Sequence, residues 1–159
     1  MPRFSCSQCG RIHYENPKMI VGCVPIWEDR VLIARRGIEP RMGLWNLPAG
    51  FMELNETVEE GAVREVYEET HAEVTLRRLH TVFNLPHEHQ VYLLFLADLR
   101  EPVWETTVES TEIRLFAEDE VPWTEMAFSS STFAIERYFS DRRSGNEAVH
   151  LGTYYKHRK

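Results

Sequence analysis

Apolar and polar positions along the chain predict short strands in the first and middle parts and two helices. Runs rich in β-branched and apolar residues are typical of strands. The expected strands cover residues 19–27, 31–34, 73–83, 91–99 and 111–116. A helical period of apolar side chains predicts helices over residues 58–70 and 129–142. Short strands with one helix midway and another near the end predict an α/β fold with a mixed sheet between helices.

The same pattern divides the chain into three segments. Residues 1–17 form a short, turn-rich opening with a Cys-x-x-Cys knuckle, and residues 18–145 form the main domain. Residues 146–159 form a basic, aromatic tail that we expect to be loosely ordered. Residues 91–99 are the most apolar run and are expected to form a central strand. The length of 159 residues fits one domain with small appendages.

The helix in the middle of the chain has a clear start signal. Thr57 and Glu60 have the spacing of a capping box, in which the threonine hydroxyl accepts from a backbone N–H and the glutamate reaches back. The helix therefore begins at Val58. Together with Ala62 and Val66, Val58 forms a narrow apolar stripe that can face a core.

Three carboxylates border that stripe. Glu65, Glu68 and Glu69 are three and four positions apart, so their side chains converge, and Gly61 is expected to leave open space beside them. Close carboxylates repel unless a cation lies among them, and oxygen-only ligands favour Mg²⁺ or Mn²⁺. The alternative is an ordinary solvated acidic face. The position beside the apolar stripe favours the metal site.

The stretch from Gly50 to Ala72 resembles the Nudix box, in which a glycine, a glutamate and an Arg-Glu-x-x-Glu-Glu run recur at fixed spacing. The matching residues are Gly50, Glu56, Arg64, Glu65, Val66, Glu68, Glu69 and Ala72. One position departs from the pattern, since His71 stands where the family has a glycine that ends the helix. The resemblance implies the Nudix α/β/α sandwich and a divalent-metal-dependent pyrophosphohydrolase.

The resemblance also implies roles for individual residues. The metal ligands would be Glu65, Glu68, Glu69 and the carbonyl of Gly50. Arg64 would hold the carboxylates in place, with Glu56 as its partner.

The general base is left open between two glutamates. Glu68 is one candidate, and Glu112 from a later strand is the other, because an unpaired glutamate is disfavoured in a strand. Glu109 competes with Glu112, and the sequence does not separate them.

Residues before the box are candidates for substrate binding. Arg36 could grip a phosphate oxygen, and the rings of Trp45 and Phe51 could stack on a base, with burial in the core as the alternative for the aromatic residues. The chain resembles Nudix enzymes that cleave FAD or ADP-ribose, which implies hydrolysis of such a nucleotide or of an NADH-like dinucleotide. The absence of an SQPWPFPxS-like segment weakens the NADH assignment. The alternative function is a non-catalytic Nudix-fold sensor that binds a nucleotide, or an interaction protein.

Cys6 and Cys9 are candidate zinc ligands. Their segment resembles half of the zinc ribbon that precedes some dinucleotide-cleaving Nudix enzymes. A structural zinc site needs four ligands, and His13, His150 and His157 are candidates for the missing ones. A homodimer that shares cysteines would also complete the site.

Charge and hydropathy argue against two classes of binding partner, nucleic acids and membranes. The formal net charge is −7, which argues against general binding to nucleic acid. No apolar run is long enough to cross a membrane, and no signal-like segment follows Met1. We therefore expect a cytoplasmic protein with a small nucleotide substrate and no membrane partner.

Overall fold

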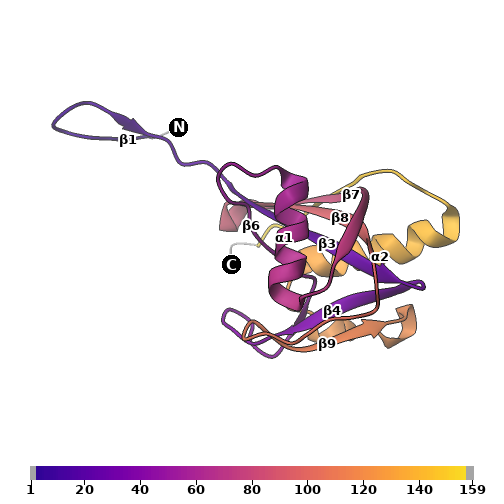
Figure 1. Ribbon diagram of the computed structural model, residues 1–159. Helices are drawn as coiled ribbons and strands as arrows, with labels where there is room; N and C mark the ends of the chain where they lie inside the picture. Colours follow the sequence, from indigo (N-terminus) through magenta and orange to yellow (C-terminus); the bar gives the residue numbers. More distant parts are fainter. Residues whose placement is uncertain (1–2, 157–159) are drawn as a thin grey trace.

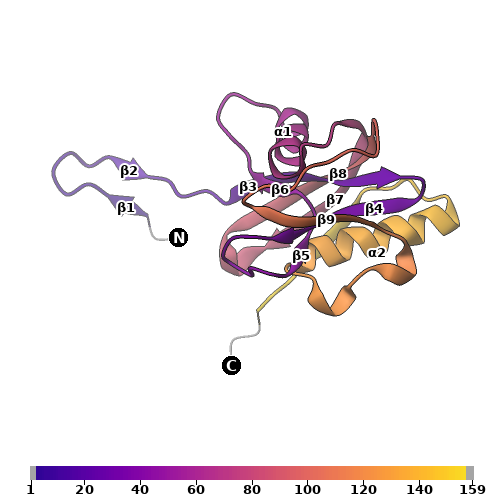
Figure 2. The same ribbon diagram turned by 60° about the horizontal axis from the view of Figure 1, so that its bottom comes forward.

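A mixed β-sheet lies between two helices in the computed structural model, which describes residues 3–156 (Figure 1, Figure 2). Within these residues the sheet has eight strands. They are β3 (Lys18–Trp27), β4 (Arg30–Arg36), β5 (Trp45–Asn46), β6 (Ala49–Phe51), β7 (Val74–Leu85), β8 (Gln90–Leu99), β9 (Ser110–Phe116) and β10 (His150–Thr153). The helices are α1 (Val58–Thr70) and α2 (Ser129–Ser144), with single 3-10 turns at Pro86–Glu88, Glu118–Glu120 and Trp123–Glu125. The predicted α/β sandwich is confirmed.

The strand order in the sheet is β10-β7-β8-β3-β4-β5, with β6 beside β3 and β9 beside β4. The β3–β8 and β7–β10 pairs are parallel, and the other pairs are antiparallel. Strand β8 lies between β3 and β7, so the prediction of a central strand is confirmed. The β3–β4 turn has positive φ angles at Glu28 and Asp29, as a two-residue hairpin requires.

Helix α1 covers one face of the sheet and begins as predicted. Thr57 and Glu60 form the complete capping box. Ala62 and Val66 are fully buried against side chains of β3, β4 and β8. Burial of a valine side chain contributes about 1.5–3 kcal/mol, so this narrow stripe is enough to fix the helix on the sheet. Gly61 does not leave open space, because a Cβ there would collide with Val21 and with the carboxylate of Glu56.

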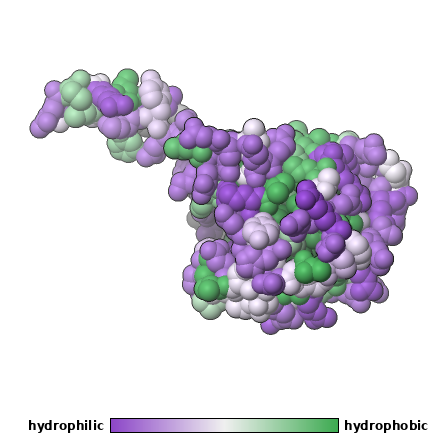
Figure 3. Space-filling view, viewed as in Figure 1, coloured by the Kyte–Doolittle hydropathy of each residue, from purple (hydrophilic) through white to green (hydrophobic). Residues whose placement is uncertain are grey.

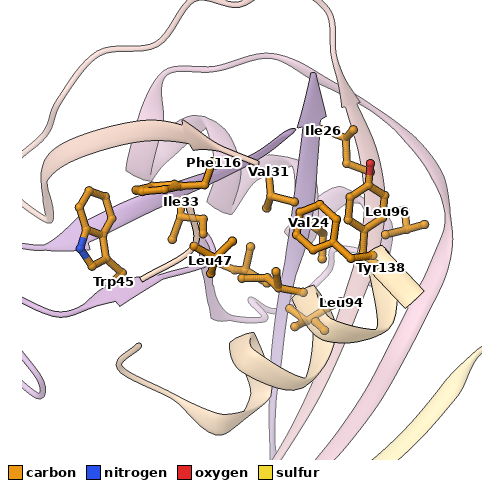
Figure 4. Close-up of a cluster of buried hydrophobic side chains, with 14 residues drawn as sticks. Val24, Ile26, Val31, Ile33, Trp45, Leu47, Leu94, Leu96, Phe116 and Tyr138 are labelled. Carbon is orange, nitrogen blue, oxygen red and sulfur yellow. The ribbon is translucent and has the colours of Figure 1, made fainter. Parts of the chain in front are cut away.

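Helix α2 covers the opposite face, where the second buried cluster lies (Figure 4). Ile135, Tyr138 and Phe139 pack from the helix onto the sheet. At the other end of this cluster Trp45 meets Phe116 edge-to-face, with 5.0 Å between ring centroids. No helix of the described residues is long and apolar enough to cross a membrane.

The two ends of the described chain lie differently relative to the sheet. A hairpin of β1 (Phe4–Ser5) and β2 (Ile12–His13) projects from the body as an arm (Figure 1). The space-filling view shows hydrophobic atoms among the hydrophilic ones on this arm (Figure 3), where Phe4 and Ile12 are exposed. The prediction of a loosely ordered tail is wrong for His150–Thr153, which form β10 at the sheet edge because they pair in parallel with β7.

His71, the departure from the family pattern, occupies the left-handed region with φ 54°. A residue with a Cβ is strained there, and glycine is not. We predict that His71→Gly raises the free energy of unfolding by about 0.5–1 kcal/mol, as measured by urea denaturation. His71→Val is the control and should lower the stability; a lower stability for the glycine variant would show that the contacts of His71 outweigh the strain.

Candidate functional site

Arg64 is the centre of the acidic edge of α1. Its guanidinium donates to both carboxylate oxygens of Glu56, at 3.0 Å from Nε and 2.7 Å from Nη2. Nη1 donates to Glu65 at 2.6 Å and to Glu68 at 3.1 Å, and Nη2 also reaches the carbonyl of Phe51 at 3.2 Å. One arginine therefore orients three carboxylates, and the predicted Arg64–Glu56 pair is present.

Glu56 is held on two sides. Besides Arg64, its Oε1 accepts the backbone N–H of Glu53 at 2.6 Å. These hydrogen bonds lower the pKa of Glu56 to about 2, the pair with Arg64 being the largest cause. Glu56 is thus a permanently charged partner that fixes Arg64.

Glu65 and Glu69 face strand β6 rather than solvent. Gly50 lies so close to the carboxylate of Glu65 that a Cβ at this position would collide with it. Glu69 accepts the backbone N–H of Ala49 at 3.3 Å. A glycine at position 50 is therefore required by close approach, and the two carboxylates contact neighbouring residues of β6.

The same two carboxylates are electrostatically crowded. Burial raises the pKa of Glu69 to about 8, and the charge of Glu65 adds to this shift. Burial also raises the pKa of Glu65, although its hydrogen bond with Arg64 opposes the change. Buried like charges favour protonation unless a cation compensates them. The oxygen-only donor set fits a hard divalent cation, because such ions take carboxylate, carbonyl and water ligands.

Glu109, not Glu112, lies electrostatically beside this cluster. The charge of Glu109 raises the pKa of both Glu65 and Glu69.

Glu112 has different neighbours, since it pairs with Arg35 at 3.5 Å. On β9 the side chain of Ile113 packs in the core beneath α1, whereas Phe116 packs in the core beneath α2. Side chains alternate along a strand, so Glu112 shares the α2 face with Phe116. The expectation that Glu112 joins the site is therefore not supported, and the competing choice, Glu109, is the one whose charge acts on Glu65 and Glu69.

A pocket of about 470 Å³ adjoins the carboxylates. Ala49 and Gly50 contribute to its wall, and these are the residues that contact Glu69 and Glu65. Its other lining residues include Arg36, Arg41, Phe51, His87, Phe128 and Tyr154. Ala49 and Gly50 of β6 thus both line a pocket with aromatic and basic walls and contact the cluster of carboxylates.

Comparisons with known proteins identify the arrangement. Residues 16–134 match the model of the NUDIX domain. The chain belongs to the Nudix family. A crystal structure of a NUDIX hydrolase from Nitrosomonas europaea superposes with a TM-score of 0.94 at 49% identity, covering 98% of this chain and 89% of that one.

Two curated relatives are similar over part of their length. NAD-capped RNA hydrolase NudC of Edwardsiella ictaluri is 33% identical over 58% of this chain and 36% of its own. ADP-ribose pyrophosphatase of Methanocaldococcus jannaschii is 32% identical over 54% of this chain and 53% of its own. The Nudix chain described here therefore matches about a third to a half of these two relatives.

The three residues predicted to bind substrate lie in different places. Arg36 lines the pocket, where its guanidinium stacks on the ring of Phe128 at 5.0 Å and donates to the carbonyl of Pro40. Phe51 also lines the pocket and is half-exposed. Trp45 is buried in the core beneath α2, so its expected contact with substrate is not supported.

Tyr154 is the lining residue that sequence reasoning missed. It follows β10, and its backbone N–H donates to the carbonyl of Asn84 on β7. Its ring meets that of His87 edge-to-face with 5.7 Å between centroids. The aromatic residues of the tail were the available signal for a role in the pocket. Tyr154 was missed because it reaches the pocket through the parallel pairing of β10 with β7, two strands that are far apart in sequence.

Cys6 and Cys9 lie on the projecting hairpin, away from the pocket. Backbone hydrogen bonds from Cys9 and Gln8 lower the pKa of the Cys6 thiol. Within residues 3–156 neither His13 nor His150 gathers with them into a group of three metal-ligating side chains, and His157 lies outside the described residues. Zinc binding by this pair stays a prediction that requires ligands from elsewhere.

If the carboxylates of Glu65 and Glu69 bind Mg²⁺, the raised pKa of Glu69 makes the affinity depend on pH. Below about pH 8 the carboxyl holds a proton that a cation must displace. We predict that the affinity for Mg²⁺ rises from pH 6 to pH 8, by up to about tenfold per pH unit for one released proton. Isothermal titration calorimetry in buffers of different ionisation enthalpy measures both the affinity for Mg²⁺ and the number of protons released on binding. Glu69→Gln should bind more weakly and lose most of this slope; an affinity independent of pH in the parent protein would contradict the assignment.

Proposed function

We propose that the chain is a divalent-metal-dependent hydrolase that cleaves the pyrophosphate of a nucleoside diphosphate linked to a second group. The observation that carries this proposal is the shared wall of the pocket and the carboxylate cluster. A substrate in the pocket can place its pyrophosphate against Ala49 and Gly50 of β6, the residues that contact Glu69 and Glu65, and so within reach of a cation that these carboxylates hold. Family membership supports the same reaction class.

Glu65 and Glu69, with the carbonyl of Gly50, would hold the cation, and Glu68 would complete the set from the exposed side. Mg²⁺ or Mn²⁺ fits these oxygen donors. When bound, such an ion neutralises phosphate oxygens and lowers the pKa of a coordinated water. Arg64 keeps the carboxylates apart and oriented, which is a positioning role.

Two glutamates are candidates for the general base. Glu68 is more than half exposed, and its contact with Arg64 leaves one oxygen free. Glu109 replaces Glu112 as the alternative, because its charge acts on Glu65 and Glu69. The base accepts a proton from the attacking water as the new P–O bond forms. The bridging P–O bond then breaks, and both products leave as phosphates.

The walls of the pocket favour a nucleotide with an aromatic group. Phe51 and Tyr154 offer exposed rings for stacking, and Arg36 and Arg41 supply positive charge for phosphate oxygens. The names of the two relatives refer to ADP-ribose and to NAD-capped RNA. Both compounds contain a pyrophosphate that joins adenosine to another group, so we propose ADP-ribose, FAD or an NADH-like dinucleotide as the substrate class.

A hydrolysis screen with Mg²⁺ or Mn²⁺ tests the proposal. It would cover FAD, NADH, ADP-ribose, diadenosine polyphosphates and nucleoside triphosphates, with products identified by mass. We predict turnover of at least one dinucleotide-like substrate, and Glu69→Gln lowers it at least ~100-fold because a charged ligand is lost.

Glu59→Gln, on the exposed first turn of α1, is the matched control and should retain full activity. Binding of these nucleotides without any hydrolysis would instead favour the sensor function. Unchanged turnover in Glu69→Gln would remove this residue from the metal site.

Removal of a stacking ring should affect substrate binding more than chemistry. We predict that Phe51→Ala and Tyr154→Ala each raise KM by about 5–100-fold, corresponding to about 1–3 kcal/mol of stacking, with a smaller change in kcat. Tyr155→Ala is the control, since Tyr155 is exposed and does not line the pocket. Equal KM values for Tyr154→Ala and Tyr155→Ala would show that the tail does not bind substrate.

A further inference from the structure

A second group of metal-ligating side chains lies outside the box. His80 on β7, Asp141 on α2 and His150 at the start of β10 bring their ligand atoms within 4.8 Å of one another. His80 and Asp141 are buried, and His150 is mostly buried. The proposed hydrolysis uses none of the three.

His80 offers an unused lone pair. Its Nε2 lies 2.9 Å from the carbonyl of Ala134, an acceptor, so Nε2 carries the proton and donates it. Nδ1 of the neutral ring then has a free lone pair, and this buried atom has no hydrogen-bond partner. It lies 3.9 Å from Oδ2 of Asp141. Two electron-pair donors at that separation repel unless a cation lies between them.

Asp141 is positioned by its other neighbours. Asn146 donates to Oδ1 at 3.2 Å, and Nε2 of His150 lies 2.8 Å from Oδ2. Nη2 of Arg78 lies 3.7 Å from the same Oδ2 and competes with a cation for it. Arg78 also donates to the carbonyls of Leu79 and Ala148, which hold it at the edge of the group.

We propose that His80 Nδ1, Asp141 Oδ2 and His150 Nε2 form a second metal site, which takes a transition-metal ion such as Zn²⁺ rather than Mg²⁺. Two imidazoles and one carboxylate are a ligand set that Zn²⁺ and its neighbours prefer. Typical Zn–N and Zn–O distances of about 2.0–2.2 Å allow one ion to bridge the 3.9 Å gap between His80 and Asp141. When the ion takes the place between His150 Nε2 and Asp141, the single proton of the neutral His150 ring moves to Nδ1, so that Nε2 is free to ligate.

Protonation of His80 does not oppose metal binding at neutral pH. Burial lowers the pKa of His80 to about 4, so its ring is neutral and ready to ligate.

The site joins the end of the chain to its body. His150 begins β10, and four residues later Tyr154 lines the pocket. An ion that ties His150 to α2 and β7 fixes the strand that carries Tyr154. The site itself does not depend on the proposed function, because none of its three ligands takes part in the proposed hydrolysis.

Zinc binding in the presence of excess Mg²⁺ tests the proposal. Full-length protein with Cys6→Ser and Cys9→Ser removes the thiols of the hairpin, and Mg²⁺ competes for the carboxylates of the box. Equilibrium dialysis against Zn²⁺ with elemental analysis should give one zinc per chain. We predict that His150→Gln weakens this binding at least about tenfold, whereas the control His13→Gln, on the exposed hairpin, leaves it unchanged.

Long-range ¹H–¹⁵N NMR of the histidine rings gives a second readout that needs no variant. Zinc should shift Nδ1 of His80 and Nε2 of His150 and leave the other histidine nitrogens in place. No zinc retained under these conditions, equal retention in His150→Gln, or shifts confined to other histidines would each overturn the proposal. Hydrolysis does not enter either measurement, so a failure here is distinguishable from a failure of the proposed function.

Discussion

Repulsion among carboxylates at one edge of α1 is the constraint on which the site depends. Arg64 compensates part of this charge, because it binds Glu56, Glu65 and Glu68 at once. Among the described residues Glu69 forms no ion pair with an arginine, and burial together with the charge of Glu65 raises its pKa to about 8. The positive charge of Arg64 therefore compensates the carboxylates that it binds, whereas the carboxylate of Glu69 near Gly50 is not compensated in this way. A cation near Gly50 would balance that charge.

The fold holds this edge in place through ordinary packing. The narrow stripe of Ala62 and Val66 fixes α1 on the sheet, and β6 pairs with β3 so that Gly50 lies against Glu65. The pocket forms where β6, the start of α2 and the end of the chain meet. The carboxylate cluster and the pocket thus both lie against β6, a strand of only three residues.

Local signals in the sequence were sufficient for the two helices, for the five longest strands and for the box, but not for β10. Thr57 and Glu60 predicted the start of α1, and the spacing of the glutamates predicted which of them converge. The residues around the box could not be predicted in the same way, because their positions depend on the pairing of strands that are far apart in sequence. The face on which Glu112 lies follows from the register of β9 against β4, and burial of Trp45 follows from its contact with Phe116. Tyr154 reaches the pocket only because β10 joins β7.

Anomalous scattering from crystals soaked in Mn²⁺ tests whether these carboxylates hold a cation. We expect a peak between the carboxylates of Glu65 and Glu69, beside the carbonyl of Gly50. Well-ordered carboxylates with no peak between them, at a Mn²⁺ concentration that supports full occupancy of other sites, would contradict it.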